Sequence, residues 1–348
     1  MRSYDRIAEL AVEIDGYSLE ARELSLSPEF TRRTTIVHLA GGGEEGLGED
    51  VTYDEGDQRA QAAGPAQPLV GRHTLVSFSS LLDGLDLWPS GPGLEAYRDY
   101  RRWAYESAAL DLALRQAGRS LAEVLERPGR PVTFVKSMGL GAPPSFEPAH
   151  RWLELYPGVR LKLDARSDWD EALMRELAAT GAVDSIDLKG AYSGTPVDQP
   201  ADPVLYERVV RFFPGAWIED PALTPETDAV LLAHRERITW DAPIHSVADV
   251  EALAFPPRMV NIKPSRSGRL ETLFELYDFC ERAGIRAYGG GQTELGPGRG
   301  QIQLLASLFH PDGPNDVAPG GYNDPEPRAG LPESPLEPRF AALGFRWA

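Results

Sequence analysis

The 348-residue sequence predicts an α/β fold in which a closed barrel of parallel strands follows an α+β domain. After Pro131, short apolar segments alternate with amphipathic helical segments such as 169–180 and 270–283, a pattern typical of a parallel sheet. Eight such strand candidates are present, and eight favour a closed barrel over an open sheet. In order, they are VTFVKSMG, VRLKLDA, VDSIDLKG, AWIEDP, RITWDAP, MVNIKPS, IRAYGGG and NDVAPGG.

The first 130 residues mix strand and helix patterns. Apolar and β-branched residues in 7–17 and 34–39 predict an antiparallel hairpin or meander, with the turn-rich LSLSPEFTRR between its strands. GGGEEGLGEDVTYDEGD predicts a mobile loop, and the apolar spacing in 94–126 predicts helix. The sequence therefore predicts an α+β domain over 1–130, a barrel over 131–323 and a proline-rich tail over 324–348 that packs on the first domain.

The charge balance limits the classes of partner. The chain has 35 basic and 53 acidic side chains, a net charge of −18, and no basic patch, so we expect neither nucleic acid nor membrane partners. Cys280 is the single cysteine, and no segment has the apolar length of a signal peptide or membrane span. A cytoplasmic location is expected, and a homo-oligomer remains open.

Three acids occupy corresponding places at predicted strand ends: Asp187 in SIDLKG, Glu219 in WIEDP and Asp241 in TWDAP. Strand ends converge in a barrel, so these carboxylates would repel one another without a cation. Oxygen ligands of this kind suit Mg²⁺, with Mn²⁺ as a substitute. Any one acid alone is more simply a helix cap or a salt-bridge partner, but three on consecutive strands favour a metal site.

Two lysines flank the acids in the same kind of position, Lys162 in RLKLDA and Lys263 in NIKPS. A lysine within an apolar strand is costly unless it is paired or lines a cavity, so both are predicted to point inward. Close to a cation and to each other, their pKa values are expected to fall, so that a neutral amine can act as a base. The equally weighted alternative is that each lysine neutralises a neighbouring carboxylate.

The order lysine, Asp, Glu, Asp, lysine on five successive strands resembles the enolase superfamily, in particular its muconate-lactonizing-enzyme-like branch, which includes o-succinylbenzoate synthases and dipeptide epimerases. The segments ALDLALRQAGRSLAEVL, GLGED and GGQTELGPGRGQIQ extend the resemblance over nearly the whole chain. It implies an α+β capping domain on a modified (β/α)7β TIM barrel. It further implies Mg²⁺ ligands at Asp187, Glu219 and Asp241, with Lys162 and Lys263 as acid/base groups on opposite faces of the substrate.

The chain departs from that pattern in three places. The second strand has Arg160-Leu161-Lys162 where Lys-x-Lys is usual, and the third has IDLKGAY where Asp-Ala-Asn is common. IDLKGAY, VNIKPS and CERAGIRAYGGGQTE are similar to methylaspartate ammonia-lyases, although those enzymes carry a histidine on the second strand. The eighth candidate strand offers only Asp316, where dipeptide epimerases use Asp-x-Asp.

The expected activity is removal of the α-proton of a small carboxylate substrate, followed by β-elimination (a lyase) or by reprotonation (a racemase or epimerase). The alternative is an inactive barrel that acts as a small-molecule binding protein. Each lesser substrate-binding candidate has a structural reading as well, as a loop hydrogen bond, a helix cap or a solvated turn. These candidates are Arg160, His245, Gln292, Glu294, Phe30 and Tyr53, with Arg32 beside them.

Overall fold

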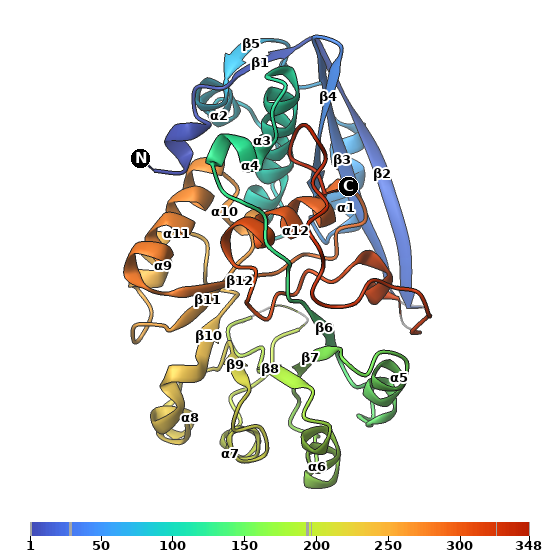
Figure 1. The fold of residues 1–348 in the computed structure, drawn as a ribbon, viewed down its shortest axis with the longest axis vertical. Coiled ribbons are helices and arrows are strands. Elements are labelled where there is room, and N and C mark those ends of the chain that lie inside the picture. Colours follow the sequence, from blue (N-terminus) through green and yellow to red (C-terminus); the bar gives the residue numbers. More distant parts are fainter. Residues whose placement is uncertain (1, 28–29, 193–194, 196, 325, 348) are drawn as a thin grey trace.

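The capping domain places a three-stranded antiparallel sheet against one long helix (Figure 1). This computed structural model describes residues 2–27, 30–192, 195, 197–324 and 326–347. The sheet has the order β2-β3-β4, and the strand β4 packs along the helix α3. These elements are β2 (Gly16–Ser27), β3 (Phe30–Gly41), β4 (Glu44–Asp50) and α3 (Tyr97–Gln116).

The predicted hairpin is present, but its strands are longer than the sequence indicated. The segment expected to be a turn continues the ladder, with Leu24 opposite Arg32 and Ser25 opposite Thr31. Alternating side chains in this segment can face the two sides of a sheet, and cross-strand pairing then outweighs its turn-forming composition. The expected helix over 94–126 divides into α3 and α4 (Leu121–Leu125), because Gly118 adopts a positive φ of 66° and Ser120 caps the second helix.

The prediction of a mobile loop over GGGEEGLGEDVTYDEGD is wrong, since this segment contains β4 and the first residues of the helix α1 (Glu55–Ala63). Its glycines allow close packing: a Cβ on Gly48 would lie 1.9 Å from the carbonyl oxygen of Ala104, and one on Gly46 would lie 2.2 Å from that of Ala108. Asp54 then starts α1 by accepting a hydrogen bond from the amide of Asp57.

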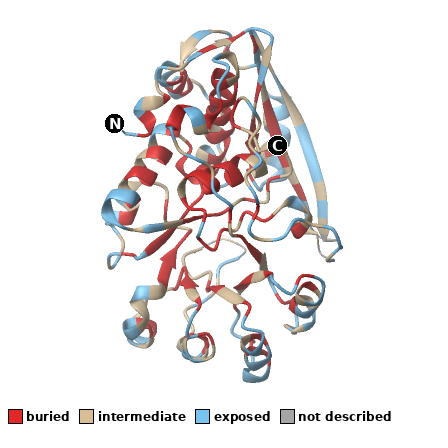
Figure 2. Ribbon diagram, in the orientation of Figure 1, coloured by how far each residue is buried: buried red, intermediate tan, exposed pale blue. Residues whose placement is uncertain are grey.

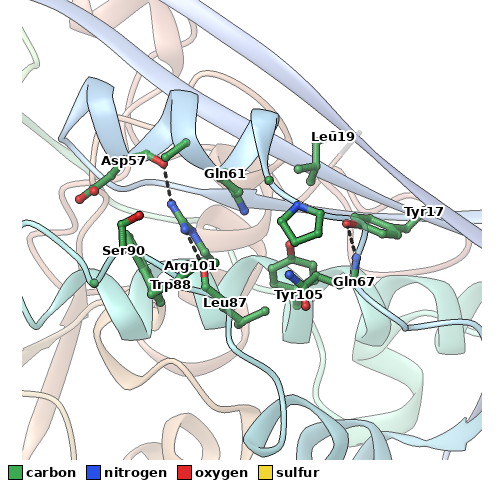
Figure 3. A pocket seen from close by; sticks show the side chains of 15 residues that line it. Tyr17, Leu19, Asp57, Gln61, Gln67, Leu87, Trp88, Ser90, Arg101 and Tyr105 are labelled. Carbon is green, nitrogen blue, oxygen red and sulfur yellow. Dashed lines mark hydrogen bonds between the residues drawn. The ribbon is translucent and has the colours of Figure 1, made fainter.

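A small cavity of about 200 Å³ lies between the sheet, α1 and α3 (Figure 3). Arg101 on its wall is buried, stacks 3.4 Å above the ring of Trp88, and pairs with Asp50 at 2.9 Å. The pair ties α3 to the end of β4, where the chain turns toward the barrel. The rest of this domain consists of η1 (Tyr4–Arg6), β1 (Ala11–Ile14), β5 (Gly71–Thr74), which pairs with β1, and α2 (Leu75–Asp83).

Seven parallel strands form the barrel sheet, and each pairs with its neighbours in sequence. They are β6 (Val135–Met138), β7 (Arg160–Asp164), β8 (Val183–Asp187), β9 (Trp217–Glu219), β10 (Ile238–Trp240), β11 (Met259–Ile262) and β12 (Arg286–Gly289). The helical segments are α5 (Glu147–Leu155), α6 (Glu171–Ala179), α7 (Pro203–Phe212), α8 (Pro225–Leu231), η2 (Leu232–Arg237), α9 (Val247–Glu251), α10 (Pro264–Ser267), α11 (Leu270–Ala283), α12 (Pro297–Phe309) and η3 (Gly320–Asn323).

The eighth candidate strand, NDVAPGG, is reduced to two isolated bridges. Asn315 pairs with Phe134 beside β6, and Asp316 pairs with Gly290 beside β12, so this segment joins the first and last strands. Pro314 precedes the segment and Pro319 lies within it, and neither can donate to a ladder, which explains why no longer strand forms.

Buried residues run continuously from the inner faces of the barrel strands to α3 (Figure 2). The C-terminal tail contacts both parts: the amide of Phe345 donates to Asp111 on α3 at 2.7 Å, and Leu336 pairs with Val132 before β6. In the described part of the chain, no helix is both long and apolar enough to cross a membrane.

Candidate active site

Strand register places three carboxylates in one row at the barrel mouth, the end formed by the carboxyl termini of β6–β12. Asp164 pairs with Asp187, and Asp187 pairs with Glu219, on the consecutive strands β7, β8 and β9. Paired residues of parallel strands point to the same side, so the three acids face the barrel interior together. Lys162 pairs with Ser185 in the next row down, further from the mouth.

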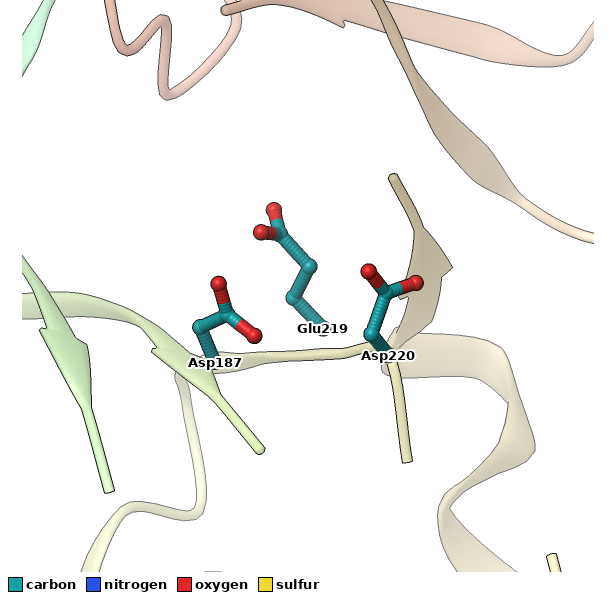
Figure 4. Close-up of side chains that lie close together, drawn as sticks. All are labelled: Asp187, Glu219 and Asp220. Atoms are coloured by element: carbon teal, nitrogen blue, oxygen red, sulfur yellow. The ribbon is translucent and has the colours of Figure 1, made fainter. Parts of the chain in front are cut away.

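Three acids form a group that could hold a metal ion: Asp187, Glu219 and Asp220 (Figure 4). One oxygen of each lies within 4.8 Å of the others, and all three residues are buried. Both carboxylate oxygens of Asp220 also accept backbone hydrogen bonds, from Asp241 and Ala242, each at 2.8 Å. Burial and the neighbouring Asp241 and Asp187 raise the pKa of Asp220 to about 7. The sequence analysis missed Asp220, although the paired acids of WIEDP signalled it.

Asp241, the third predicted ligand, lies outside this group among the described residues. Two cations hold it: Lys263 Nζ at 2.8 Å and Arg266 Nη1 at 2.8 Å. The hydroxyl of Tyr192 donates a third contact at 2.8 Å. Burial would raise the pKa of Asp241, but Arg266 and Lys263 outweigh it and hold that pKa well below its usual range.

Lys162 is 2% exposed, and its ammonium group lies against Glu219, 3.7 Å from Asp187 and 4.0 Å from Asp316. A fall in its pKa is expected beside a bound divalent cation, whereas its contacts with carboxylates act in the opposite direction. Burial lowers the pKa, but the attraction of Glu219, Asp187 and Asp316 outweighs burial and raises the pKa well above its ordinary value. These contacts are the ones expected of a counterion of the carboxylates, the alternative that the sequence left open.

Lys189, which follows Asp187 by two residues, is a site residue that the sequence analysis did not select. Its φ of 53° is left-handed, its ammonium group contacts Asp187, and its Nζ lies 3.2 Å from Oδ1 of Asp164. The signal was the departure of IDLKGAY from Asp-Ala-Asn, because this lysine stands where that motif has asparagine. Tyr288, whose hydroxyl donates to Glu219, carried no comparable signal.

Lys263 follows β11 at the mouth, and 8% of its side chain is exposed. Its aliphatic chain lies against Gly290 at the end of β12, where a Cβ would come within 2.6 Å of Lys263 Cε. Glycine at position 290 therefore leaves the space that the lysine occupies.

The predicted substrate-binding residues lie in different parts of the barrel and the capping domain. Arg160 lies at the amino end of β7 and pairs with Asp184 at 2.8 Å. The amino ends of the strands are opposite the mouth, so Arg160 lies away from the acids gathered there. His245 lies 3.1 Å from the carbonyl oxygen of Arg266, a structural contact in the loop after β10.

Gln292 and Glu294 lie in the loop after β12, and both are buried. The side-chain amide of Gln292 donates to the hydroxyl of Tyr100 at 2.9 Å. The Glu294 carboxylate accepts a hydrogen bond from the backbone N–H of Gln292 and forms a salt bridge with Arg299 at 3.0 Å. The Gln292 side chain thus connects this loop to the capping domain, and the Glu294 side chain holds the loop together.

Arg32 joins the capping domain to the mouth. It is fully buried and donates to the carbonyl oxygens of Val51 at 2.6 Å, Thr52 at 2.8 Å and Gln292 at 2.8 Å. Its guanidinium lies 4.1 Å above the ring of Tyr53. Phe30 and Tyr53 remain 40% and 37% exposed, so they are available to meet a molecule at the rim.

The acidic groups at the mouth outnumber the basic groups, and a divalent cation would offset the difference. Four cationic side chains face six carboxylic acids, and although the pKa of Asp220 is raised to about 7, the acids leave an excess of negative charge that a divalent ion would offset. A buried excess of this sign is unfavourable without an ion, and the all-oxygen donors suit Mg²⁺. The cations are Lys162, Lys189, Lys263 and Arg266, and the acids are Asp164, Asp187, Glu219, Asp220, Asp241 and Asp316.

Solved structures with the same architecture include a dipeptide epimerase from Enterococcus faecalis (TM-score 0.66, 16% identity, 93% of this chain and 92% of that chain). A muconate cycloisomerase from Pseudomonas fluorescens is similar (TM-score 0.63, 19% identity, 88% and 87%). N-succinylamino acid racemases from Thermus thermophilus (27% identity, 88% of this chain, 86% of the relative) and an Amycolatopsis species (28%, 85% and 80%) are sequence relatives.

The fold is that of the solved muconate cycloisomerase and dipeptide epimerase structures, which confirms the predicted barrel with a capping domain. A further solved structure with this fold is described as a member of the enolase superfamily. The chain itself belongs to the family described as "Domain of unknown function (DUF8230)". Its N-terminal profile matches residues 5–124 and its C-terminal profile matches residues 128–324.

Proposed function

We propose that this protein is an Mg²⁺-dependent enzyme that removes the α-proton of a small carboxylate substrate. The product then forms by β-elimination or by return of a proton to the same carbon. One observation carries the proposal: the buried carboxylates of Asp187, Glu219 and Asp220 meet at the barrel mouth, where Lys263 follows β11. The inactive binding barrel is the weaker alternative, because relatives over most of the chain are named as enzymes.

In this proposal, Asp187 and Glu219 hold the ion, with Asp220 or Asp241 as the third ligand. A bound Mg²⁺ would offset the negative charge that develops on the substrate carboxylate as its α-proton leaves. Nζ of Lys263 takes that proton, and Asp241, 2.8 Å away, orients the amine. Arg32 and Tyr53 close the capping domain over the mouth and exclude water.

The relatives named N-succinylamino acid racemase make N-acylated amino acids the first substrates to test. The decisive measurement is hydrogen exchange at the α-carbon, followed by proton NMR in deuterated water with Mg²⁺. The panel contains N-succinyl, N-acetyl and free amino acids, together with small dicarboxylic acids. We expect exchange that a chelator abolishes and that Lys263→Met abolishes.

Lys136→Met is the matched control, because Lys136 is a buried barrel lysine whose Nζ donates only to the carbonyl oxygen of Ser137 among the hydrogen bonds of the described residues. This variant should exchange at the wild-type rate. If the wild-type protein with Mg²⁺ exchanges no member of the panel, the proposed function is wrong for these substrate classes and the binding-protein alternative gains.

A further inference from the structure

We propose that proton transfer in this site is confined to the face of Lys263, and that the opposite face carries an ion pair, Asp164 with Lys189, that binds the substrate. This inference rests on the proposed function and specifies its outcome. Exchange proceeds with retention of configuration, or leads to elimination, and the protein does not racemise its substrate.

The first support is the register of the second and third barrel strands. Asp164, the last residue of β7, pairs with the proposed metal ligand Asp187, whereas Lys162 pairs with Ser185. Two residues along a strand correspond to about 7 Å. Lys162 thus starts about one row below the metal-binding row, and the residue of β7 that reaches the mouth is Asp164.

The second support is the surroundings of Lys162. Its side chain is 2% exposed and its ammonium group touches Glu219, with Asp187 at 3.7 Å and Asp316 at 4.0 Å. The ammonium group is thus enclosed by the carboxylates that surround the proposed ion. Lys162 therefore positions the carboxylates that bind the ion and does not touch the substrate.

The third support is the solvent accessibility of the Asp164–Lys189 ion pair, which lies nearer to the mouth than the start of the Lys162 side chain. The side chain of Asp164 is 38% exposed and that of Lys189 is 18% exposed, and their charged groups are 3.2 Å apart. The pair presents one hydrogen-bond acceptor beside one donor. A trans amide points its N–H and C=O groups in opposite directions, so the pair can bind one of these groups of an N-acylated amino acid, the N–H at Asp164 or the C=O at Lys189.

The chemical consequence follows from the number of proton carriers. Inversion at a carbon requires one group to remove the proton from one face and another to deliver a proton to the opposite face. With Lys263 as the single proton carrier, deuterium enters where the proton left. The carbon–hydrogen bond breaks and a carbon–deuterium bond forms on the same face, so the enantiomer is unchanged.

The test follows N-acetyl and N-succinyl derivatives of L- and D-amino acids with wild-type protein and Mg²⁺ in deuterated water. Proton NMR measures exchange, and chiral chromatography measures the enantiomer ratio. We expect exchange of one enantiomer with no formation of the other. Asp164→Asn removes a charge that binds the substrate. We expect its fold increase in KM to be roughly ten times its fold decrease in kcat. A racemised product would overturn the inference while leaving the proposed function intact.

Calorimetric titration with Mn²⁺ tests the role of Lys162 independently of any substrate. Lys162→Met removes a cation from the binding carboxylates, so Mn²⁺ affinity should rise roughly tenfold or more, and Lys162→Gln is a second variant with the same expectation. Lys136→Met should bind Mn²⁺ as the wild type does. Unchanged Mn²⁺ affinity in a folded Lys162 variant would contradict the inference. Absence of exchange in the wild type would instead defeat the proposed function, and this titration would still decide the role of Lys162.

Discussion

Gly290 lies so close to Lys263 that a Cβ on the glycine would come within 2.6 Å of the lysine Cε. Gly290 and Lys263 directly follow the neighbouring strands β12 and β11, at the barrel mouth. Since a real Cβ cannot occupy that position, the identity of residue 290 controls where the proposed base stands.

Gly290→Ala should therefore displace the Lys263 amine. A shift of about 1 Å at a reacting group can cost roughly 100-fold in rate, so we expect a loss of that order in α-hydrogen exchange. Gly215→Ala is the control, because a Cβ there has open space. Exchange assays and thermal unfolding would be measured for both. Wild-type exchange in Gly290→Ala would show that the position of Lys263 does not limit the reaction.

Metal binding should stabilise the folded protein through the acids of the mouth. With Mg²⁺ at about 100 times its Kd, the free energy of unfolding should rise by about 2.7 kcal/mol. Asp187→Asn should lose most of this rise, because its carboxylate belongs to the group that converges within 4.8 Å. Asp184→Asn on the same strand should keep it, since Asp184 pairs with Arg160 at the opposite end. Urea unfolding with and without Mg²⁺ gives the comparison.

Stability should fall in acid because of His310. Burial lowers the pKa of this imidazole from 6.5 to about 4, with Nδ1 2.7 Å from Oδ1 of Asn315. The unfolded chain binds a proton between these two values and the folded chain does not. The contribution of His310 is therefore complete above pH 6.5 and is lost as the pH falls toward 4, by about 3 kcal/mol.

Urea unfolding at pH 7 and pH 4.5 would measure this loss. His310→Gln keeps a polar side chain near Asn315 but cannot take up the proton, so its free energy of unfolding should fall less over the same interval. An equal fall in both proteins would assign the acid sensitivity to other groups.

The closure of the mouth should depend on Arg32. Arg32→Gln removes the donors that hold Val51 and Thr52 against the barrel loop at Gln292. A looser rim should raise KM roughly tenfold, equivalent to about 1.4 kcal/mol, with a smaller effect on kcat. Arg22→Gln on the neighbouring strand removes only an exposed pair with Glu20 and should leave both constants unchanged. Equal effects of the two substitutions on KM would show that Arg32 does not control closure of the mouth.

The alternation of strands and helices and the polar residues at strand ends were sufficient to predict the barrel, its capping domain, and Asp187 and Glu219 at its mouth. This worked because both signals are periodic and local: apolar residues repeat with the strand, and a charge that ends a buried strand is conspicuous. The sequence missed the strand β4 and helix α1, because its glycines indicate a loop unless the helix that they pack against is known.

By itself, the sequence determined the class of fold and the end of the barrel at which chemistry can occur. Only the tertiary structure decided that Asp164, and not Lys162, shares the row of Asp187, because register depends on hydrogen bonds between strands that are distant in the chain. It also decided that Asp220 joins Asp187 while Asp241 pairs with Lys263, since the position of each carboxylate depends on cations brought from other strands.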